Sequence, residues 1–400
     1  MNNTFHLNKE KLNSLFIKFM VIDLLFFPNF LFSTPLSFFL LPCVLIFNNR
    51  LKASILCVFM VIVIFMLASV INGSVEHSNT EVENLKRVIQ FLLIASLFLY
   101  KNAAFDFHGV VIFFNKLVCI FIIYLCALLF FSFFNESFYL TLISYLSPMT
   151  ILQIKENINI NRFSYYFSDP NSLGYLLSFV YVYVLFHFRK LNVKMFIFTL
   201  IFVMVLFTQS RGALISMLLV TVAYTFYKLD FNMKSIRALV FISVFLIVTA
   251  FILQDYIILV NDAFKARSEI EAAMGTGLGG GRDVKYKYLI DNFNFKFFGV
   301  GYSLYIDSKE FRPHSDFIRM ILSYGIFSLI PLCIFLFPSN FRSFVLLLAF
   351  SVPFMINSVI DDYRLFGIFI IFFIIIERYN KQLSFPSKDV SSEYGFYRRV

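Results

Sequence analysis

Long apolar segments recur along almost the whole chain, and they constrain the fold more than any other feature. About twelve can be counted, most of them near the roughly 20 residues that a membrane-spanning helix needs, although the second is short. They cover residues 13–30, 35–48, 52–71, 85–100, 110–134, 172–188, 193–209, 212–228, 237–254, 315–337, 341–358 and 364–378. Only 14% of the residues are charged, whereas an average soluble domain carries about 25%. The sequence therefore predicts an all-α polytopic membrane protein, with residues 1–400 forming a single integral membrane domain.

Lysine and arginine residues gather in alternate turns between these segments. One set of turns holds Arg50, Lys52, Lys101, Arg189, Lys190, Lys194, Lys228, Lys234, Arg237 and Arg342, and the tail adds Arg378, Lys381, Lys388, Arg398 and Arg399. The opposite short turns hold Glu76, Glu81, Glu83, Asp361 and Asp362, with Lys86 and Arg87 as the main exception. Because short loops rich in Lys and Arg stay on the cytoplasmic side, we expect both termini there. This spread of basic residues also argues against a nucleic-acid partner.

Two longer polar stretches fall on the outward side in this arrangement. The larger covers residues 255–313 and carries five of the 14 glycines between Gly275 and Gly281. Loops of this length in compact proteins are usually lids, binding loops or disordered segments, and we expect this one to cap an active site. The smaller covers residues 135–171 and begins with ESFYLTLISYL, an amphipathic stretch expected to lie in the membrane interface.

Two arginines on this side are candidates for chemistry. Arg211 lies in TQSRGALIS, where one span ends outside and the next begins, and ionisable groups at such positions are functional candidates. The alternative is an interfacial anchor. Arg282 follows the glycine cluster and offers a fork suited to phosphate, although it can also be a solvated loop residue. The GxGxxG match at Gly275–Gly280 lacks the strand and helix of a nucleotide site.

His314 is the only one of the five histidines at an outward span entrance beside a basic loop. An imidazole is the usual general base near neutral pH; a capping or interfacial histidine is the alternative. Asp316 follows two residues later, and Arg312 precedes it. Further upstream, Asp169–Pro170–Asn171 is typical of a turn and helix start. Arg162 supplies one more outward cation.

The residue types favour a substrate with a diphosphate and no metal. The five cysteines lie in apolar runs, and no His, Cys or Asp cluster has metal spacing. The adjacent pair Asp361–Asp362 could hold a cation, but such a pair at a helix end more often faces water. Several arginines can neutralise a leaving diphosphate, and a histidine can deprotonate an acceptor hydroxyl. No cofactor is therefore expected.

Five segments between Arg162 and Gly325 together resemble the O-antigen polymerase and O-antigen ligase family of bacterial envelope glycosyltransferases. They are FSDPNSLG, TQSRGA, GGGRD, FFGVGYS and PHSDFIRMILSYG, in that order. The resemblance implies a multi-span inner-membrane protein with one large periplasmic loop. It implies glycan transfer from undecaprenyl diphosphate without a metal, with Arg211, Arg282 and His314 as the catalytic set. Arg162, Asn171, Arg312 and Asp316 are then expected to bind the substrate, while Ser315 stands where relatives often have asparagine.

Three functions stay open at this point. A polymerase joins lipid-linked repeat units, and this reading is favoured. A ligase moves finished chains to lipid A core or another acceptor. A transporter or flippase is the third, although transporters usually carry ionisable groups near the midplane, where only Lys18, Asp23 and Lys116 lie. The expected partners are the bilayer and undecaprenyl-diphosphate-linked oligosaccharide, with a chain-length regulator and a flippase as candidate protein partners.

Overall fold

The computed structural model describes residues 2–27, 34–46, 96–146, 150–228, 315–360 and 362–384, the hairpin residues 304–306 and 309–311, Gly299, and isolated positions between 63 and 93. The spans expected at 52–71 and 237–254 lie largely or wholly outside these residues. So does most of the polar stretch 255–313, including Arg282 and Arg312, and His314 just after it.

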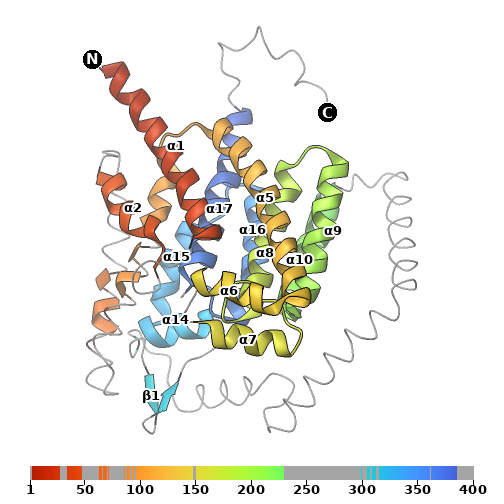
Figure 1. The fold of residues 1–400 in the computed structure, drawn as a ribbon. Coiled ribbons are helices and arrows are strands. Elements are labelled where there is room, and N and C mark those ends of the chain that lie inside the picture. Colours follow the sequence, from red (N-terminus) through yellow and green to blue (C-terminus); the bar gives the residue numbers. More distant parts are fainter. Residues whose placement is uncertain are drawn as a thin grey trace.

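The described chain is almost entirely helical (Figure 1). Its helices are α1 (Asn2–Phe26), α2 (Leu36–Ile46), η1 (Leu97–Asn102), α5 (Phe107–Phe134), α6 (Glu136–Leu146), α7 (Ile151–Asn159), α8 (Pro170–His187), α9 (Leu191–Thr208), α10 (Arg211–Lys228), α14 (Asp316–Tyr324), η3 (Ile326–Ser328), α15 (Leu329–Leu336), α16 (Phe341–Ile356) and α17 (Tyr363–Ser384). The exception is an antiparallel pair, β1 (Leu304–Ile306) and β2 (Lys309–Phe311), in which Leu304 lies opposite Phe311. The all-α prediction missed this short hairpin.

Helix α8 forms the centre of the bundle. Nearly all of its residues are buried, and it packs against α9, α10, α16 and α17. A helix that is apolar all round is expected to be enclosed by others. Aromatic rings fill the contact between α8, α16 and α17: the ring of Phe350 stacks on that of Phe369 at 4.2 Å, and Phe179 lies 5.4 Å from Phe369. Since lipid is as apolar as these side chains, close packing rather than water exclusion holds spans together.

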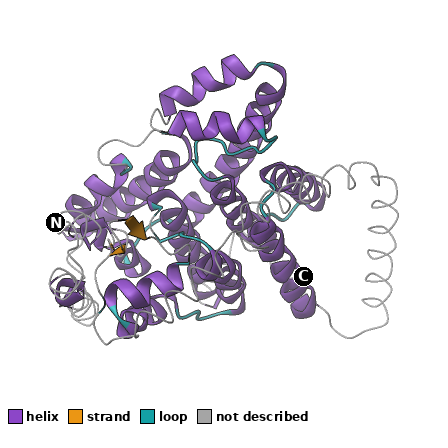
Figure 2. Cartoon of the chain, turned by 90° about the horizontal axis from the view of Figure 1, so that it is seen from below, coloured by secondary structure: helices purple, strands orange, loops and turns teal. Residues whose placement is uncertain are grey.

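One end of the bundle carries the starts of α8, α10 and α14 and the end of α16; we call it the Asp316 end. Helices α6, α7 and α14 lie across it at the bottom of Figure 1, and the view from below shows helices lying lengthwise across this end (Figure 2). Helix α1 begins and α17 ends at the opposite side (Figure 1). The start of α1 and the end of α17 therefore lie on the same side of the described bundle.

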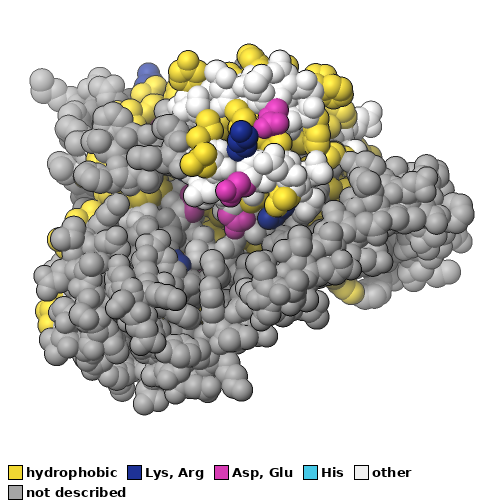
Figure 3. Space-filling view, turned by 60° about the horizontal axis from the view of Figure 1, so that its bottom comes forward, with side chains coloured by type: hydrophobic (Ala, Val, Ile, Leu, Met, Phe, Trp, Pro, Cys, Tyr) yellow, Lys and Arg dark blue, Asp and Glu magenta, His cyan; other side chains and the backbone are white. Residues whose placement is uncertain are grey.

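The amphipathic stretch of the smaller loop is a helix, as predicted. Helix α6 covers Glu136–Leu146 and buries Tyr139 and Ile143. The neighbouring α7 buries Ile154 and exposes Lys155 and Glu156. The described part of the surface at the Asp316 end carries apolar side chains together with a few acidic and basic ones (Figure 3). Such a mixture suits helices that lie at a membrane–water boundary.

Two described helices, α5 and α9, are long and apolar enough to cross a membrane. Residues 211–227, 326–336 and 341–356 form shorter apolar helices. The predicted count of about 12 spans and their orientation therefore stay predictions.

The span expected at 315–337 is not one helix, which corrects the prediction. Helix α14 ends at Tyr324, and Gly325 adopts a φ of 85° before η3 and α15 follow. Glycine populates this left-handed region without the cost that a Cβ would bring, so it commonly ends helices. The nine residues of α14 cover about 13 Å, too short to cross a bilayer. Asp316 therefore begins a short helix at the end of the bundle.

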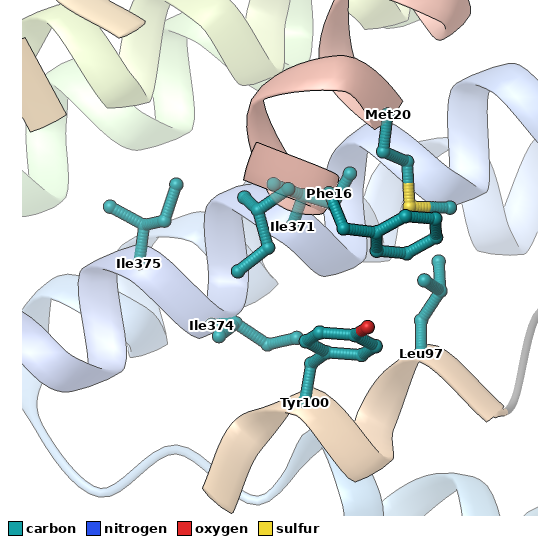
Figure 4. Close-up of a pocket in the computed structure, with 8 residues that line it drawn as sticks. Phe16, Met20, Leu97, Tyr100, Ile371, Ile374 and Ile375 are labelled. Atoms are coloured by element: carbon teal, nitrogen blue, oxygen red, sulfur yellow. The ribbon is translucent and has the colours of Figure 1, made fainter. Parts of the chain in front are cut away.

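A small apolar pocket lies between α1, η1 and α17, away from the Asp316 end. Its lining includes Phe16, Met20, Leu97, Tyr100 and Ile374 (Figure 4). The rings of Phe16 and Tyr100 stack at 5.6 Å. The pocket contains no candidate site residue, so it belongs to the packing of the bundle.

Candidate functional site

Arg211 is the first residue of α10, directly after a two-residue turn. Helix α9 ends at Thr208, and Gln209 adopts the left-handed conformation with a φ of 52°. Ser210 Oγ accepts a hydrogen bond from the N–H of Ala213 at 3.3 Å, as residues that cap a helix start do. The side chain of Arg211 is exposed, whereas Gly212 and Ala213 are buried. The turn thus presents a guanidinium at the surface while its neighbours pack inward.

Two glycines let this turn approach α8 and α16 closely. A Cβ added at Gly212 would lie 2.2 Å from Tyr175 Oη and 2.8 Å from Ile356 Cδ1. A Cβ at Gly174 would lie 2.8 Å from Ser210 Cβ and 2.9 Å from Ala213 Cβ. Small residues allow helix backbones to meet at such distances. The position of Arg211 is therefore fixed by packing against two neighbouring helices.

Arg162 reaches the same turn from the segment that follows α7. Its side chain is buried, with 8% exposed. Nε donates to the carbonyl of Thr208 at 3.1 Å, and Nη2 donates to Asn171 Oδ1 at 3.4 Å. The backbone alongside is also paired, because the N–H of Phe163 donates to the carbonyl of Phe207 at 2.9 Å. The structure thus places Arg162 against protein groups rather than at the surface.

Asp169 caps α8 and also links α8 to the end of α16. Its Oδ1 accepts from the backbone N–H of Asn171 at 2.9 Å and from Asn171 Nδ2 at 2.8 Å. Pro170 occupies the first turn of the helix, where its missing N–H costs nothing. These contacts confirm the helix start predicted from Asp169–Pro170–Asn171. In addition, Asp169 Oδ2 accepts from Asn357 Nδ2 at 3.4 Å, a contact that the local pattern did not predict.

Asp316 is held in the break between α16 and α17. Its Oδ2 accepts from the backbone N–H groups of Val359 and Ile360, the latter at 2.8 Å, and its own N–H donates to the carbonyl of Asn357 at 3.0 Å. The side chain is 1% exposed, and Oδ1 has no hydrogen-bond partner among the described residues. Burial raises the pKa of Asp316 to about 7, against the opposing effects of Arg319 and the two N–H donors.

These contacts join four candidate segments at one end of the bundle. We call residues 208–211 the Arg211 turn. A chain of hydrogen bonds runs from the Thr208 carbonyl of this turn through Arg162, Asn171, Asp169 and Asn357 to Asp316. Ser315, one residue after His314, caps α14 by accepting from the N–H of Ile318 at 3.3 Å. Arg282, Arg312 and His314 lie outside the described residues, so their positions are not tested. Asn357 was missed from the sequence; its one signal was a polar break between two apolar helices.

Arg364 forms a second buried polar contact near this end, and it is structural. Its guanidinium donates to the carbonyls of Asp23 at 3.3 Å and Leu24 at 3.1 Å and to that of Phe27, all at the C-terminus of α1. The guanidinium also lies 4.5 Å over the ring of Tyr166. A cation near a helix C-terminus offsets the exposed carbonyl dipoles. With 4% of its surface exposed, Arg364 anchors α1.

Described carboxylates at this end accept hydrogen bonds from backbone N–H groups. Asp362 Oδ1 accepts from the N–H groups of Arg364 at 2.9 Å and Leu365 at 3.2 Å, so it caps α17, while Asp361 lies outside the described residues. Within the described part of the chain, no group of three His, Cys, Asp or Glu side chains is arranged to hold a metal ion. The Asp361–Asp362 pair is thus accounted for in part by helix capping.

Comparison with known proteins gives one match. Residues 195–333 match a family model described as O-antigen ligase. This stretch contains the Arg211 turn, Arg282, His314 and the start of α14, and it confirms the family resemblance inferred from the sequence motifs. No curated protein and no solved structure matches the chain.

Proposed function

We propose that this chain, of which residues 195–333 match a family model described as O-antigen ligase, is an O-antigen polymerase, or one for a capsule or exopolysaccharide. It would join undecaprenyl-diphosphate-linked oligosaccharide repeat units by metal-independent glycosyl transfer. The observation that supports the proposal is the exposed Arg211, which is fixed by packing. It lies three residues after Thr208, whose carbonyl begins the chain of hydrogen bonds to the start of α14 just after His314.

The chemistry follows from the charges that the reaction develops. The acceptor hydroxyl attacks the anomeric carbon of the donor sugar, the bond from that carbon to the phosphate oxygen breaks, and undecaprenyl diphosphate leaves. Arg211 and Arg282 would bind the diphosphate and neutralise its developing charge. His314 would accept the proton of the attacking hydroxyl. Asn171 and Arg312 would contact the bound glycan or diphosphate, whereas the substrate contact expected of Asp316 does not fit its buried side chain, and no cofactor takes part.

The apolar helices and the family match support a membrane protein that acts on lipid-linked glycans. We further propose a multi-pass protein of the bacterial inner membrane with both termini cytoplasmic. Residues 135–171 and 255–313 would then be periplasmic loops. A chain-length regulator and a flippase are the proposed protein partners.

The second candidate is an O-antigen ligase, because the matched family covers ligases as well as polymerases. The phenotype of a gene deletion separates the two. Loss of a polymerase leaves lipid A core that carries a single repeat unit, and this is the result we expect. Bare core together with accumulated lipid-linked polymer would instead identify a ligase.

A transporter or flippase is the lesser alternative. Of the three ionisable residues expected at membrane depth, Asp23 already accepts from the N–H of Ser37 at 2.7 Å, and Lys18 lies 5.7 Å over the ring of Phe113. Lys116 is exposed on α5. This arrangement does not suit a polar path through the bundle, which transport of a charged substrate needs.

Alanine variants test the residue roles. Arg211→Ala, Arg282→Ala and His314→Ala should each abolish long-chain glycan in a deletion strain while the protein stays in the membrane. Lys190→Ala is a matched control, because Lys190 is exposed in the turn before α9, at the opposite end. Gel ladders of the surface glycan give the readout. Normal ladders from two of the three variants would end the proposal.

A further inference from the structure

We infer that Arg162 is a positioning residue, which holds the Arg211 turn in register with the start of α14. This role differs from the substrate contact expected of an outward cation, and it rests on the proposed function. The inference comes from the place of Arg162 in the hydrogen-bond chain and from the burial of its side chain.

The guanidinium of Arg162 is already used by the protein. Nε donates to the carbonyl of Thr208 and Nη2 to Asn171 Oδ1, at 3.1 Å and 3.4 Å. The side chain is 8% exposed, whereas that of Arg211 is exposed at the surface of the same turn. Arg211 is thus accessible at the surface, whereas Arg162 is enclosed by protein groups.

The carbonyl of Thr208 explains why an arginine serves here. Thr208 is the last residue of α9, and Gln209 then turns into the left-handed conformation. The last carbonyls of a helix lack partners within the helix, and a cation there is favourable. A planar fork can donate to this carbonyl and to an amide on α8 at once, whereas a lysine ammonium is a single flexible point charge.

The guanidinium of Arg162 connects the Arg211 turn to the rest of the hydrogen-bond chain. On one side Thr208 lies three residues before Arg211. On the other side Asn171 donates to Asp169, which accepts from Asn357, whose carbonyl accepts from the N–H of Asp316, two residues after His314. Loss of the guanidinium would therefore let the Arg211 turn move relative to α8 and α14.

Two further contacts should preserve the fold without Arg162. The N–H of Phe163 donates to the carbonyl of Phe207 at 2.9 Å, and Gln209 Nε2 donates to the carbonyl of Asn161 at 3.3 Å. The turn would then be loosened rather than lost. Because misplacement by about 1 Å can cost about 100-fold in rate, we expect a large effect on activity with little effect on stability.

The test is a double-mutant cycle on the purified full chain with a lipid-linked oligosaccharide donor. Arg162→Gln should lower kcat about 10- to 100-fold and change KM for the donor less than about threefold. Arg211→Lys should also lower kcat. The kcat of the double variant should be no more than about threefold below that of Arg211→Lys alone, because both changes disturb the same contact between guanidinium and diphosphate.

A matched control is Arg364→Gln, which also removes a buried guanidinium from helix-end carbonyls, but at α1. In the double variant of Arg364→Gln and Arg211→Lys, the fold losses of kcat should multiply. The positioning role would be overturned if the kcat losses of Arg162→Gln and Arg211→Lys multiplied in the double variant, or if Arg162→Gln changed only KM. It would also be overturned if the lower activity of Arg162→Gln were fully explained by a lower melting temperature. Full activity of Arg211→Lys would instead count against the proposed function itself.

Discussion

Gly212 packs tightly against Tyr175 and Ile356, so we expect Gly212→Ala to disturb the Arg211 turn. The new Cβ would lie 2.2 Å from Tyr175 Oη, 2.8 Å from Ile356 Cδ1 and 3.1 Å from Tyr175 Cε1. Tyr175 is only 2% exposed, so its ring cannot swing into solvent. Either the ring or the turn must therefore move.

The size of the effect follows from two opposing contributions. Overpacking of this kind costs about 1–3 kcal/mol, and replacing glycine by alanine inside a helix returns up to about 1 kcal/mol. With the full gain subtracted, we expect a net loss of stability of up to about 2 kcal/mol. Activity should fall further, because a shift of Arg211 by about 1 Å can cost about 100-fold in kcat.

The background variant Tyr175→Phe tests the cause. It removes the hydroxyl oxygen at 2.2 Å and leaves the ring carbon at 3.1 Å. Melting temperature in detergent and polymerisation rate would be measured for the wild type, both single variants and the double variant. Gly212→Ala should be several times less harmful in the Tyr175→Phe background. Equal damage in both backgrounds would refute the proposed packing.

Three further predictions concern the chemistry. Arg211→Lys should lower the polymerisation rate at least about tenfold, because lysine cannot make the forked contact with a phosphate; wild-type activity would contradict this. Polymerisation should continue in EDTA, since arginines rather than a metal neutralise the leaving group, and its disappearance would contradict the metal-free mechanism. The pKa of Asp316 is raised from 3.8 to about 7 in the folded protein, so its contribution to stability is present at low pH and is lost as the pH rises through that range. The melting temperature should therefore fall more steeply from about pH 5 to about pH 8 in the wild type than in Asp316→Asn, and parallel curves would exclude a titration of Asp316.

Local patterns predicted several elements at this end of the bundle. The amphipathic stretch gave α6 its bounds at Glu136 and Leu146, and the Asp169–Pro170–Asn171 turn marked the start of α8. The polar residues TQSR between two apolar runs marked the turn that presents Arg211. In each case the signal lies within a few neighbouring residues, where capping and periodicity act.

Other features depend on contacts that no local pattern encodes. The contact between Asp169 and Asn357 joins residues 188 positions apart, and Asp316 accepts from N–H groups more than 40 positions away. The break at Gly325 was overlooked because a hydropathy window averages over a single glycine. Arg162 carries the same charge as Arg211, and only the folded chain shows that one is buried and the other exposed.

We propose that the arginines and the histidine meet on the extracytoplasmic side, and chemical labelling from outside the membrane can detect this. Arg282→Cys, His314→Cys and Lys190→Cys would be introduced separately into a variant that lacks the five native cysteines, and intact spheroplasts would be treated with a membrane-impermeant maleimide. We expect labelling at positions 282 and 314 and none at 190 until the membrane is opened. Labelling at 190 alone would show the opposite orientation and refute the proposed site.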